Sequence, residues 1–485
     1  MPFDLKEAAR REMIREGFEP DFPPAVLGEV SAMGDAGARA AMAKGGAERD
    51  LRDLLWSSID NPESRDLDQV EVAEALPGGE TKVLIGIADV DSLVKHDSAT
   101  DRHAGRNTTS VYCGVTVFPM LPEQLSTGLT SLNQDADRLA LVIELVVAPD
   151  GVIRSHDAYP AWLRNRAQLD YPAVGGWLEG RSPAPVKIAG SGPLQEQLRL
   201  QDRVAQALRT QRHRAGALEL ETIEATPVTQ DGRVTDLQLH AKSRATELIE
   251  DFMIAANVSI AAFLDAAASP SIRRVVKTPE RWDRIVALAV AHGARLPPEP
   301  SSEALAQFLS QRRAADPDRF PDLSLAVVKL MGPGAYTLQR VGQASQGHFG
   351  LAVHDYTHST APNRRFADLV TQRLLKAVFA GGAPAYRDDE LERIAAQCTK
   401  MEDAARKLER TIRKQAAALL LAGRIGERFD ALVTGVSPKG TFVRALHPPV
   451  EGMLTHGQQG LDVGDRVTVR LADVNPEGGF IDFTR

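Results

Sequence analysis

The stretch Trp-Ser-Ser-Ile-Asp-Asn-Pro-Glu-Ser-Arg-Asp-Leu-Asp-Gln, residues 56–69, brings three aspartates together around one turn. Residues 54–59 are predicted to form a strand with Asp60 at its end, and the Asn-Pro pair that follows favours a turn. Asp66 and Asp68 then project to one side, because side chains alternate along an extended chain. Oxygen ligands without His or Cys nearby favour magnesium or manganese over zinc. The alternative is a solvated acidic turn, since Asp and Asn are common turn residues.

The composition is that of a globular protein with more than one domain. The chain has 485 residues, of which 43% are hydrophobic and 25% charged, so it is too long for one ordinary core. The net charge of -8 argues weakly against a nucleic-acid partner, because proteins that bind nucleic acids usually carry an excess of Lys and Arg. Basic residues nevertheless outnumber acidic ones between Lys400 and Arg424, so a local basic helix can exist within an acidic protein.

Cysteine usage and the first residues indicate the compartment. Cys113 and Cys398 are the two cysteines of the chain and form no paired motif, which favours a reducing cytoplasm. Residues 1–18 mix charges and lack the apolar centre of a signal peptide. Apolar runs stay well short of the ~20 residues that cross a bilayer. We therefore expect a cytoplasmic protein without a membrane partner.

Changes of periodicity predict an α+β protein with three parts. Residues 1–50 contain short helices, which form either a helix-turn-helix-like appendage or a helical lead-in. Residues 51–425 begin with strands and continue with long helices, so a large mixed sheet-and-helix domain is expected. Residues 426–485 contain five short strands between Gly-rich turns, a pattern typical of a five-stranded OB-fold. More local predictions are helices over 26–44, 194–214, 243–268 and 388–422, a helix from Asn363 after Pro362, a strand over 111–118, and a hairpin of 218–226 with 234–240.

Seven ordered blocks between residues 51 and 425 resemble the catalytic domain of the ribonuclease II family, also called RNB exoribonucleases. The tail resembles the S1-type RNA-binding OB-fold found at the end of family members. The blocks are Asp60-x5-Asp66-x-Asp68, Ile87-Ala-Asp-Val90, Thr109-Ser-Val-Tyr112, Phe118-Pro-Met-Leu-Pro122, Glu250–Asn257, Gly347-His-Phe-Gly-Leu351 and Tyr356–Asp368.

The resemblance implies a magnesium-dependent enzyme that hydrolyses RNA processively from its 3′ end to nucleoside 5′-monophosphates. Asp60, Asp66 and Asp68 are the expected ligands of two magnesium ions, which manganese can replace. Of the three, Asp68 is the one we expect to be indispensable for catalysis. The expected partner is RNA with a 3′ end, no obligate protein partner is implied, and we predict a monomer.

Two adjacent arginines are candidates for binding the scissile phosphate. Arg364 and Arg365 follow Pro362 at a predicted helix start, where backbone amides and the helix dipole favour an anion. A guanidinium there can bind a phosphate through two hydrogen bonds and stabilise developing negative charge. The family arginine maps best to Arg364, with Arg365 as competitor. The alternative is an arginine that pairs with Asp368 one helical turn further on.

The resemblance also implies residues that contact RNA. Tyr112 matches an aromatic that stacks on a base, a contact that tolerates any sequence. Tyr171 and Glu250 match positions that contact the terminal sugars, where a carboxylate can recognise the 2′-hydroxyl. The remaining RNA-binding candidates are Asn257, which shares a helical face with Glu250, Glu409, and Phe442 in the predicted barrel.

Other chemistries find no support in the motifs. His354 and His358 are four residues apart and His348 precedes them, but no Glu follows the first histidine of the pair, as a zinc protease motif requires. The chain also has no Walker phosphate loop and no Gly-x-Ser-x-Gly elbow, so nucleotide hydrolysis and serine-esterase chemistry are not predicted.

Two departures from the family pattern lead to further hypotheses. Gln69 stands where the family usually has an aspartate; its amide oxygen can still bind a metal, but with less charge. Only about fifty residues precede the resemblance, too few for the two cold-shock barrels of typical members, so we expect a more open entry and better tolerance of duplex RNA. The rival functions are an RNA-binding protein with an impaired nuclease site, and a metal-dependent endonuclease or DNA exonuclease.

Overall fold

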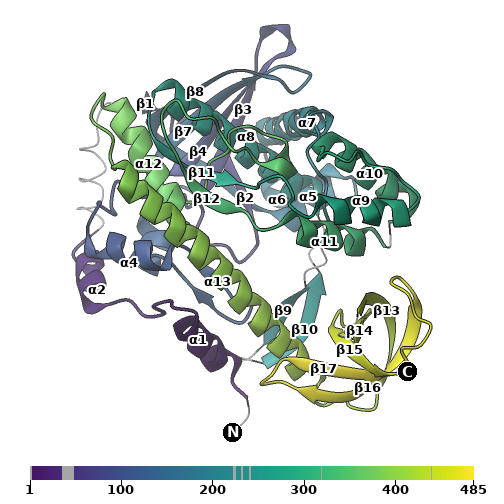
Figure 1. Ribbon diagram of the computed structural model, residues 1–485. Coiled ribbons are helices and arrows are strands. Elements are labelled where there is room, and N and C mark those ends of the chain that lie inside the picture. Colours follow the sequence, from purple (N-terminus) through teal and green to yellow (C-terminus); the bar gives the residue numbers. More distant parts are fainter. Residues whose placement is uncertain are drawn as a thin grey trace.

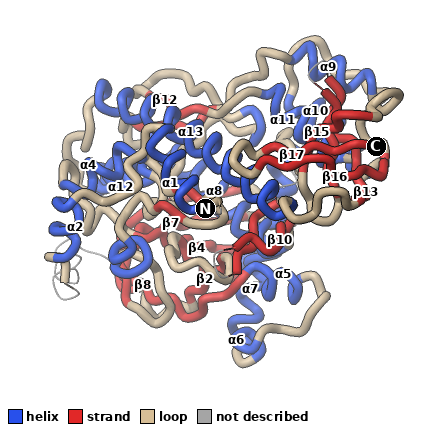
Figure 2. The backbone as a smooth tube through the Cα atoms, turned by 90° about the horizontal axis from the view of Figure 1, so that it is seen from below, coloured by secondary structure: helices blue, strands red, loops and turns tan. Residues whose placement is uncertain are grey.

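The computed structural model describes residues 3–34, 49–221, 225–230, 233–239, 242–317, 319–437 and 440–485. It confirms the α+β class: a large domain of mixed sheet and helices carries a five-stranded barrel at the C-terminal end (Figure 1). Figure 2 shows the barrel at one end of the molecule and the N-terminal helix α2 (Pro24–Ser31) near the opposite end. None of the helices in these residues is long and apolar enough to cross a membrane.

The main sheet of the large domain has six strands in the order β1-β8-β2-β3-β4-β7. The long strand β8 pairs with β7 along its first part and with β2 along its last part, so it joins both ends of the series β2-β3-β4-β7. The strands are β1 (Arg49–Asp50), β2 (Trp56–Asp60), β3 (Gln69–Ala75), β4 (Thr81–Ala88), β7 (Asp137–Val147) and β8 (Ile153–Asp170).

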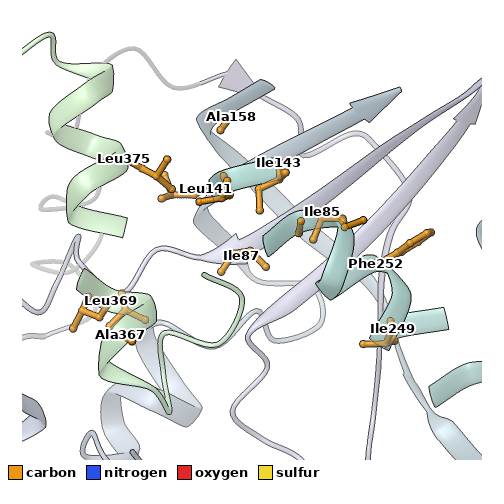
Figure 3. Packing of buried hydrophobic residues seen from close by; sticks show 14 of the residues in the cluster. Ile85, Ile87, Leu141, Ile143, Ala158, Ile249, Phe252, Ala367, Leu369 and Leu375 are labelled. Carbon is orange, nitrogen blue, oxygen red and sulfur yellow. The ribbon is translucent and has the colours of Figure 1, made fainter. Parts of the chain in front are cut away.

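Both faces of this sheet are buried, because its strands carry apolar residues at successive positions. Ile85 and Ile87 of β4 belong to a cluster that also contains residues of α8 and α12, as Figure 3 shows. Leu84 and Ala88, at the alternate positions of the same strand, belong to a second cluster formed mostly by strand residues. A Cβ atom at Gly86 would lie 2.6 Å from the side chain of Leu163 in this second cluster, so a larger residue there would force that leucine to shift.

The helices cover the sheet and extend to its sides. Ser191 and Ser243 accept hydrogen bonds from the first turns of the two long helices α7 and α8, which pack against each other. The helices are α1 (Leu5–Arg15), α2, α4 (Ala99–Asn107), α5 (Tyr171–Leu178), α6 (Val186–Ala189), α7 (Gly192–Arg214), α8 (Arg244–Ala266), α9 (Trp282–Ala291), α10 (Ser302–Ala315), α11 (Phe320–Met331), α12 (Phe366–Phe379) and α13 (Asp388–Leu421).

The 34-residue helix α13 runs from the large domain to the barrel (Figure 1). At a rise of 1.5 Å per residue it is about 50 Å long. Met401, Leu408 and Ile412 of this helix share a cluster with α1, which therefore packs on the large domain. Toward its end, Gln415 donates a hydrogen bond of 2.8 Å to the backbone oxygen of Glu477 in the barrel.

The C-terminal barrel closes in the order β13-β14-β15-β17-β16. Alternate residues of its strands form a separate apolar core, as the period-two pattern predicts. A bidentate ion pair from Arg444 to Asp322 of α11 ties the barrel to the large domain. The strands are β13 (Arg428–Ser437), β14 (Gly440–Ala445), β15 (Glu451–His456), β16 (Arg466–Asn475) and β17 (Phe480–Thr484).

Several local predictions need correction. The helix expected from Asn363 begins at Phe366, because tertiary hydrogen bonds hold the preceding residues in a turn: the amide of Asn363 donates to Asp68, and the oxygen of Arg364 accepts from Ser110. The strand expected over 111–118 is a hairpin of two short strands, β5 (Val111–Tyr112) and β6 (Val117–Phe118).

Two further corrections concern the first helices and the second hairpin. The helix expected over 26–44 ends at Ser31, and residues 35–48 lie outside the described part of the chain. The hairpin strands are β9 (Ala225–Gln230) and β10 (Arg233–Leu239). The first strand starts later than predicted because Glu219 and Glu221 instead form ion pairs with Arg313 of α10. Residues 231 and 232 of the predicted turn lie outside the described residues.

Candidate active site

Asp60 lies at the end of β2, as predicted, and is largely buried. Its Oδ1 accepts a hydrogen bond of 3.2 Å from the side-chain amide of Gln69, the first residue of β3. Its Oδ2 is buried and has no hydrogen-bond partner among the described residues. Burial raises the pKa of Asp60 to about 6; the charge of Asp66 adds to this rise, and Gln69 and Arg364 oppose it. A cation bound at the free oxygen would stabilise the ionised form of this buried carboxyl.

Asp68 is 2% exposed and links β3 to the segment before α12. Its Oδ1 accepts from the backbone amide of Asn363 at 2.9 Å, and its Oδ2 accepts from Nε of Arg364 at 3.2 Å. Burial raises the pKa of Asp68 to about 7, although Arg364 and the amide bond both act to lower it. Residues almost 300 positions apart thus meet around one buried carboxyl.

Asp66 is less buried and contacts the aromatic candidate. Its Oδ2 accepts a hydrogen bond of 3.1 Å from the hydroxyl of Tyr112, on the hairpin β5-β6. The backbone amide of Tyr112 donates to Glu409 of α13 at 3.1 Å. Tyr112 remains 42% exposed, so its ring has a free surface beside the aspartates.

The two arginines have different environments. Arg365 donates to Asp368 at 2.8 Å, and the side chain of Asp368 is fully buried. Arg365 is therefore the arginine that pairs with Asp368, the alternative to phosphate binding considered above. Arg364 lies beside Asp68 with 44% of its side chain exposed. Of the two, Arg364 is the arginine that can reach a phosphate near the aspartates.

The candidates for sugar contacts are only partly brought together. Tyr171 is the first residue of α5 and follows Asp170, the register partner of Asp60. Burial raises its pKa, and the charges of Asp60 and Glu71 act in the same direction, so the phenol lies near both carboxyls. Glu250 of α8 is exposed and pairs with Lys242 at 3.0 Å.

Asn257, by contrast, is 2% exposed. Its Oδ1 accepts from the amide and hydroxyl of Ser359, and its amide donates to the hydroxyl of Tyr356. Although it shares a helical face with Glu250, the structure uses it inside the protein, where it holds the segment that leads to Arg364. Phe442 lies on β14 of the barrel, 39% exposed and outside the group around Asp68.

The histidines considered for zinc lie in different settings. His358 is partly buried, with its Nδ1 2.8 Å from the hydroxyl of Tyr336, and Nδ1 of His348 accepts from the amide of Leu351. Within the described residues, one group of three possible ligands has all its atoms within 4.8 Å, namely His96, Asp97 and Asp101. Asp60, Asp66 and Asp68 do not form such a compact group in the described structure. Asp101 is paired with Arg373.

Sequence reasoning missed several buried charges next to the site. Glu71 of β3 is 0% exposed; burial raises its pKa well above the usual range, and the charge of Asp60 adds to this. The available signal was a glutamate in the extended segment that follows Asp68. Lys376 of α12 pairs with Asp89 at 2.6 Å and Asp91 at 3.1 Å, which attaches this helix to the end of β4.

The oxygen donors around Asp60 and Asp68 fit a divalent cation of the magnesium type. Asp60 is largely buried and Asp68 fully so, Arg364 is paired with Asp68, and Oδ2 of Asp60 lacks a partner in the described structure. The described contacts of Asp60 and Asp68 include no sulfur or imidazole group, either of which would favour zinc. Residues from β2, β3 and the turn before α12 thus form a site suited to phosphate chemistry.

The chain belongs to the RNB domain family. The RNB domain model matches residues 48–381, and the model of the RNase II-type exonuclease C-terminal S1 domain matches residues 427–485. Among its curated relatives are proteins named Ribonuclease R. That of Thermotoga maritima is 30% identical over 446 residues, 90% of this chain and 61% of the relative. That of Escherichia coli is 30% identical over 476 residues, 90% of this chain and 57% of the relative. The chain thus spans about three-fifths of the length of these relatives.

Solved structures share the fold. The apo form of Mycoplasma genitalium RNase R superimposes with a TM-score of 0.85 at 23% identity, covering 99% of this chain and 78% of that one. The same protein in complex with double-stranded RNA gives a TM-score of 0.84 at 24% identity, covering 99% and 83%. Yeast Ssd1, described as a pseudonuclease, gives 0.68 at 16% identity, covering 88% and 53%. These likenesses establish the fold alone.

Proposed function

We propose that this protein is a metal-dependent exoribonuclease that hydrolyses RNA processively from its 3′ end and releases nucleoside 5′-monophosphates. The observation that carries the proposal is the buried pair Asp60 and Asp68 with Arg364 beside it, inside an RNB domain. Relatives named Ribonuclease R support the same activity. The proposed location is the cytoplasm, supported by two buried free cysteines, and the proposed state is a monomer.

Each residue has a proposed role in the reaction. Asp60, Asp66 and Asp68 hold Mg²⁺, with Mn²⁺ as a substitute and the amide oxygen of Gln69 as a further ligand. Divalent ions bound there supply activation of a water and neutralisation of charge at the phosphate. Arg364 binds the scissile phosphate and stabilises the negative charge that develops on it. Arg365 holds the turn that presents Arg364, through its pair with Asp368.

Binding of the RNA strand is assigned to residues around this centre. Tyr112 stacks on a base with its exposed ring, and Glu409 fixes the backbone of that tyrosine. Tyr171 and Glu250 contact the terminal sugars, and Phe442 contacts the strand on the barrel. Tolerance of duplex RNA is part of the proposal, and the solved complex of Mycoplasma genitalium RNase R with double-stranded RNA supports it.

The test is product analysis with RNA labelled uniformly along its length, which reveals released mononucleotides, and in parallel with 5′-labelled RNA, which reveals where hydrolysis stops. A single strand and a duplex with a 3′ overhang are incubated with Mg²⁺, and products are resolved at nucleotide resolution. We expect mononucleotides, no activity in excess chelator, and loss of hydrolysis with retained RNA binding in Asp68→Asn. Glu74→Gln, on the exposed part of β3, serves as the matched control. A stall several nucleotides before the duplex would contradict duplex tolerance.

The same assay separates the rival functions. A binding protein with an impaired site is the second candidate, because Gln69 offers Asp60 an amide N–H where the family usually has a carboxylate. That protein would bind RNA and leave it intact in Mg²⁺. Internal fragments would instead indicate an endonuclease, and digestion of DNA a broader exonuclease.

A further inference from the structure

The proposed metal site contains three aspartates, whereas the family pattern has a fourth carboxylate at the position of Gln69. Gln69 turns its amide nitrogen toward Oδ1 of Asp60, at 3.2 Å. A neutral amide that donates to a ligand oxygen adds no negative charge to bind a divalent ion. If the site is a two-ion site as proposed, charge has to come from another residue nearby.

Glu71 lies two residues further along β3, on the same face of the strand as Gln69. The register partners of these two residues on β4 are Ile85 and Ile87, which both belong to the apolar cluster that faces the helices. On β2 the partner of Glu71 is Ser57, three residues before Asp60. The carboxyl of Glu71 therefore points into the protein, on the side of the sheet where Gln69 reaches Asp60.

The carboxyl of Glu71 is fully buried, and neither oxygen has a hydrogen-bond partner among the described residues. Burying a carboxyl without a partner costs several kcal/mol. Three buried oxygens on neighbouring elements also lack a partner among the described residues: Oγ of Ser57, Oδ2 of Asp60, and Oε1 of Gln201, whose Nε2 donates to the backbone oxygen of Glu71. Such a collection of buried oxygens without donors is suited to a bound cation and poorly suited to an ordinary core.

Asp60 joins this cluster to the site, because its Oδ1 accepts from Gln69, two residues before Glu71 on the same face of β3, and its free Oδ2 is buried. We propose that Glu71 is a metal-positioning residue whose carboxylate supplies the negative charge that Gln69 lacks and strengthens binding of the divalent ion held by Asp60. The inference rests on the proposed function, since it concerns the same metal site. It assigns a fourth acidic side chain that the motif does not contain.

The two positions on β3 are expected to be interchangeable sources of charge. In Gln69→Asp the site gains a carboxylate close to Asp60, so Glu71 becomes less necessary. The effects of Gln69→Asp and Glu71→Gln on metal affinity are therefore not additive. A purely structural role for Glu71 would give no such coupling, because packing in the core does not depend on which residue carries charge at position 69.

The test is calorimetric titration of the whole chain with Mn²⁺, without RNA. We expect Glu71→Gln to weaken Mn²⁺ binding at least tenfold in the native background and less than threefold in the Gln69→Asp background. Glu74→Gln, on the same strand but exposed and paired with Lys82, is expected to bind Mn²⁺ like the native chain. Equal affinities of the native chain and Glu71→Gln would overturn the inference, as would the same loss in both backgrounds.

Two additions keep the outcome decisive. If Glu71→Gln does not fold, Glu71→Asp replaces it; a shorter carboxylate is expected to weaken Mn²⁺ binding, and an unchanged affinity counts against the inference. Release of mononucleotides by the native chain is measured separately. A native chain whose Mn²⁺ affinity depends on Glu71 but which leaves RNA intact would refute the proposed function and keep the metal-site inference.

Discussion

Replacement of Asp368 by asparagine is expected to lower the free energy of unfolding of the large domain strongly, although Asp368 does not contact the substrate. Oδ1 of Asp368 accepts two hydrogen bonds of 2.8 Å, from the backbone amide of Ala361 and from Arg365. The carboxyl is fully buried, so Asp368→Asn leaves the charge of Arg365 unpaired inside the protein. Breaking a buried ion pair by removing one partner costs about 3–5 kcal/mol. We expect a loss of that size in the free energy of unfolding.

Urea unfolding followed by tryptophan fluorescence measures this loss. The four tryptophans lie at positions 56, 162, 177 and 282, so the signal reports on the large domain and not on the barrel. The matched control is Asp389→Asn at the start of α13, whose carboxylate pairs with Arg387 while both side chains stay mostly exposed. Exposed pairs contribute about 0–1 kcal/mol, and the control is expected to lose no more than that.

A double variant tests whether the unpaired charge of Arg365 causes the loss of stability. Arg365→Met removes the charge that Asp368→Asn leaves unpaired, so the two together are expected to be more stable than Asp368→Asn alone. Because the turn over residues 361–364 carries the amide of Asn363 and the side chain of Arg364, we also expect Asp368→Asn to reduce RNA hydrolysis more than RNA binding. An Asp368→Asn variant within about 1 kcal/mol of the native chain would refute the buried-pair argument.

Two further predictions concern RNA affinity and pH. Tyr112→Ala is expected to weaken binding of a short single-stranded RNA about 5- to 150-fold, because one stacked base contributes ~1–3 kcal/mol. Tyr112→Phe keeps the ring and is expected to keep most of the affinity. Equal affinities of Tyr112→Ala and the native chain in fluorescence anisotropy titrations would contradict the stacking role. Burial and Arg274 lower the pKa of His348 to about 4, so below pH 6.5 the unfolded chain takes up a proton that the folded chain does not. The contribution of His348 to stability is therefore expected to fall by about 2–3 kcal/mol between pH 7.5 and 4.5, so over that range the free energy of unfolding of the native chain is expected to fall by this amount relative to that of His348→Gln.

The sequence predicted those parts of the structure that local patterns determine. The five barrel strands follow from period-two alternation between glycine turns, and Asp60 lies at its strand end because β2 and the Asn-Pro turn are both local features. The long helices α8 and α13 were predicted to within a few residues for the same reason.

What the sequence could not predict depends on contacts between distant segments. Which of two adjacent arginines meets Asp368 is decided by the turn that the bond from Asn363 to Asp68 imposes, 295 residues away in the chain. The burial of Asn257 depends on the segment around Ser359, which packs over α8. Glu71 was visible as a glutamate in a strand, but its unmatched oxygens become apparent only when β2, β3 and α7 are assembled.

The helix α13 has a consequence for how the RNA contacts can vary. Glu409 anchors the backbone of Tyr112, and Gln415, six residues later, anchors the barrel. Glu409 and Gln415 are separated by about 9 Å of continuous helix, so the helix fixes the distance between the ring of Tyr112 and the barrel. One inserted residue between them would turn the barrel by about 100° and advance it by about 1.5 Å. This spacing can therefore change only in steps of roughly a whole helical turn, three or four residues at a time, if the barrel is to keep facing the same strand.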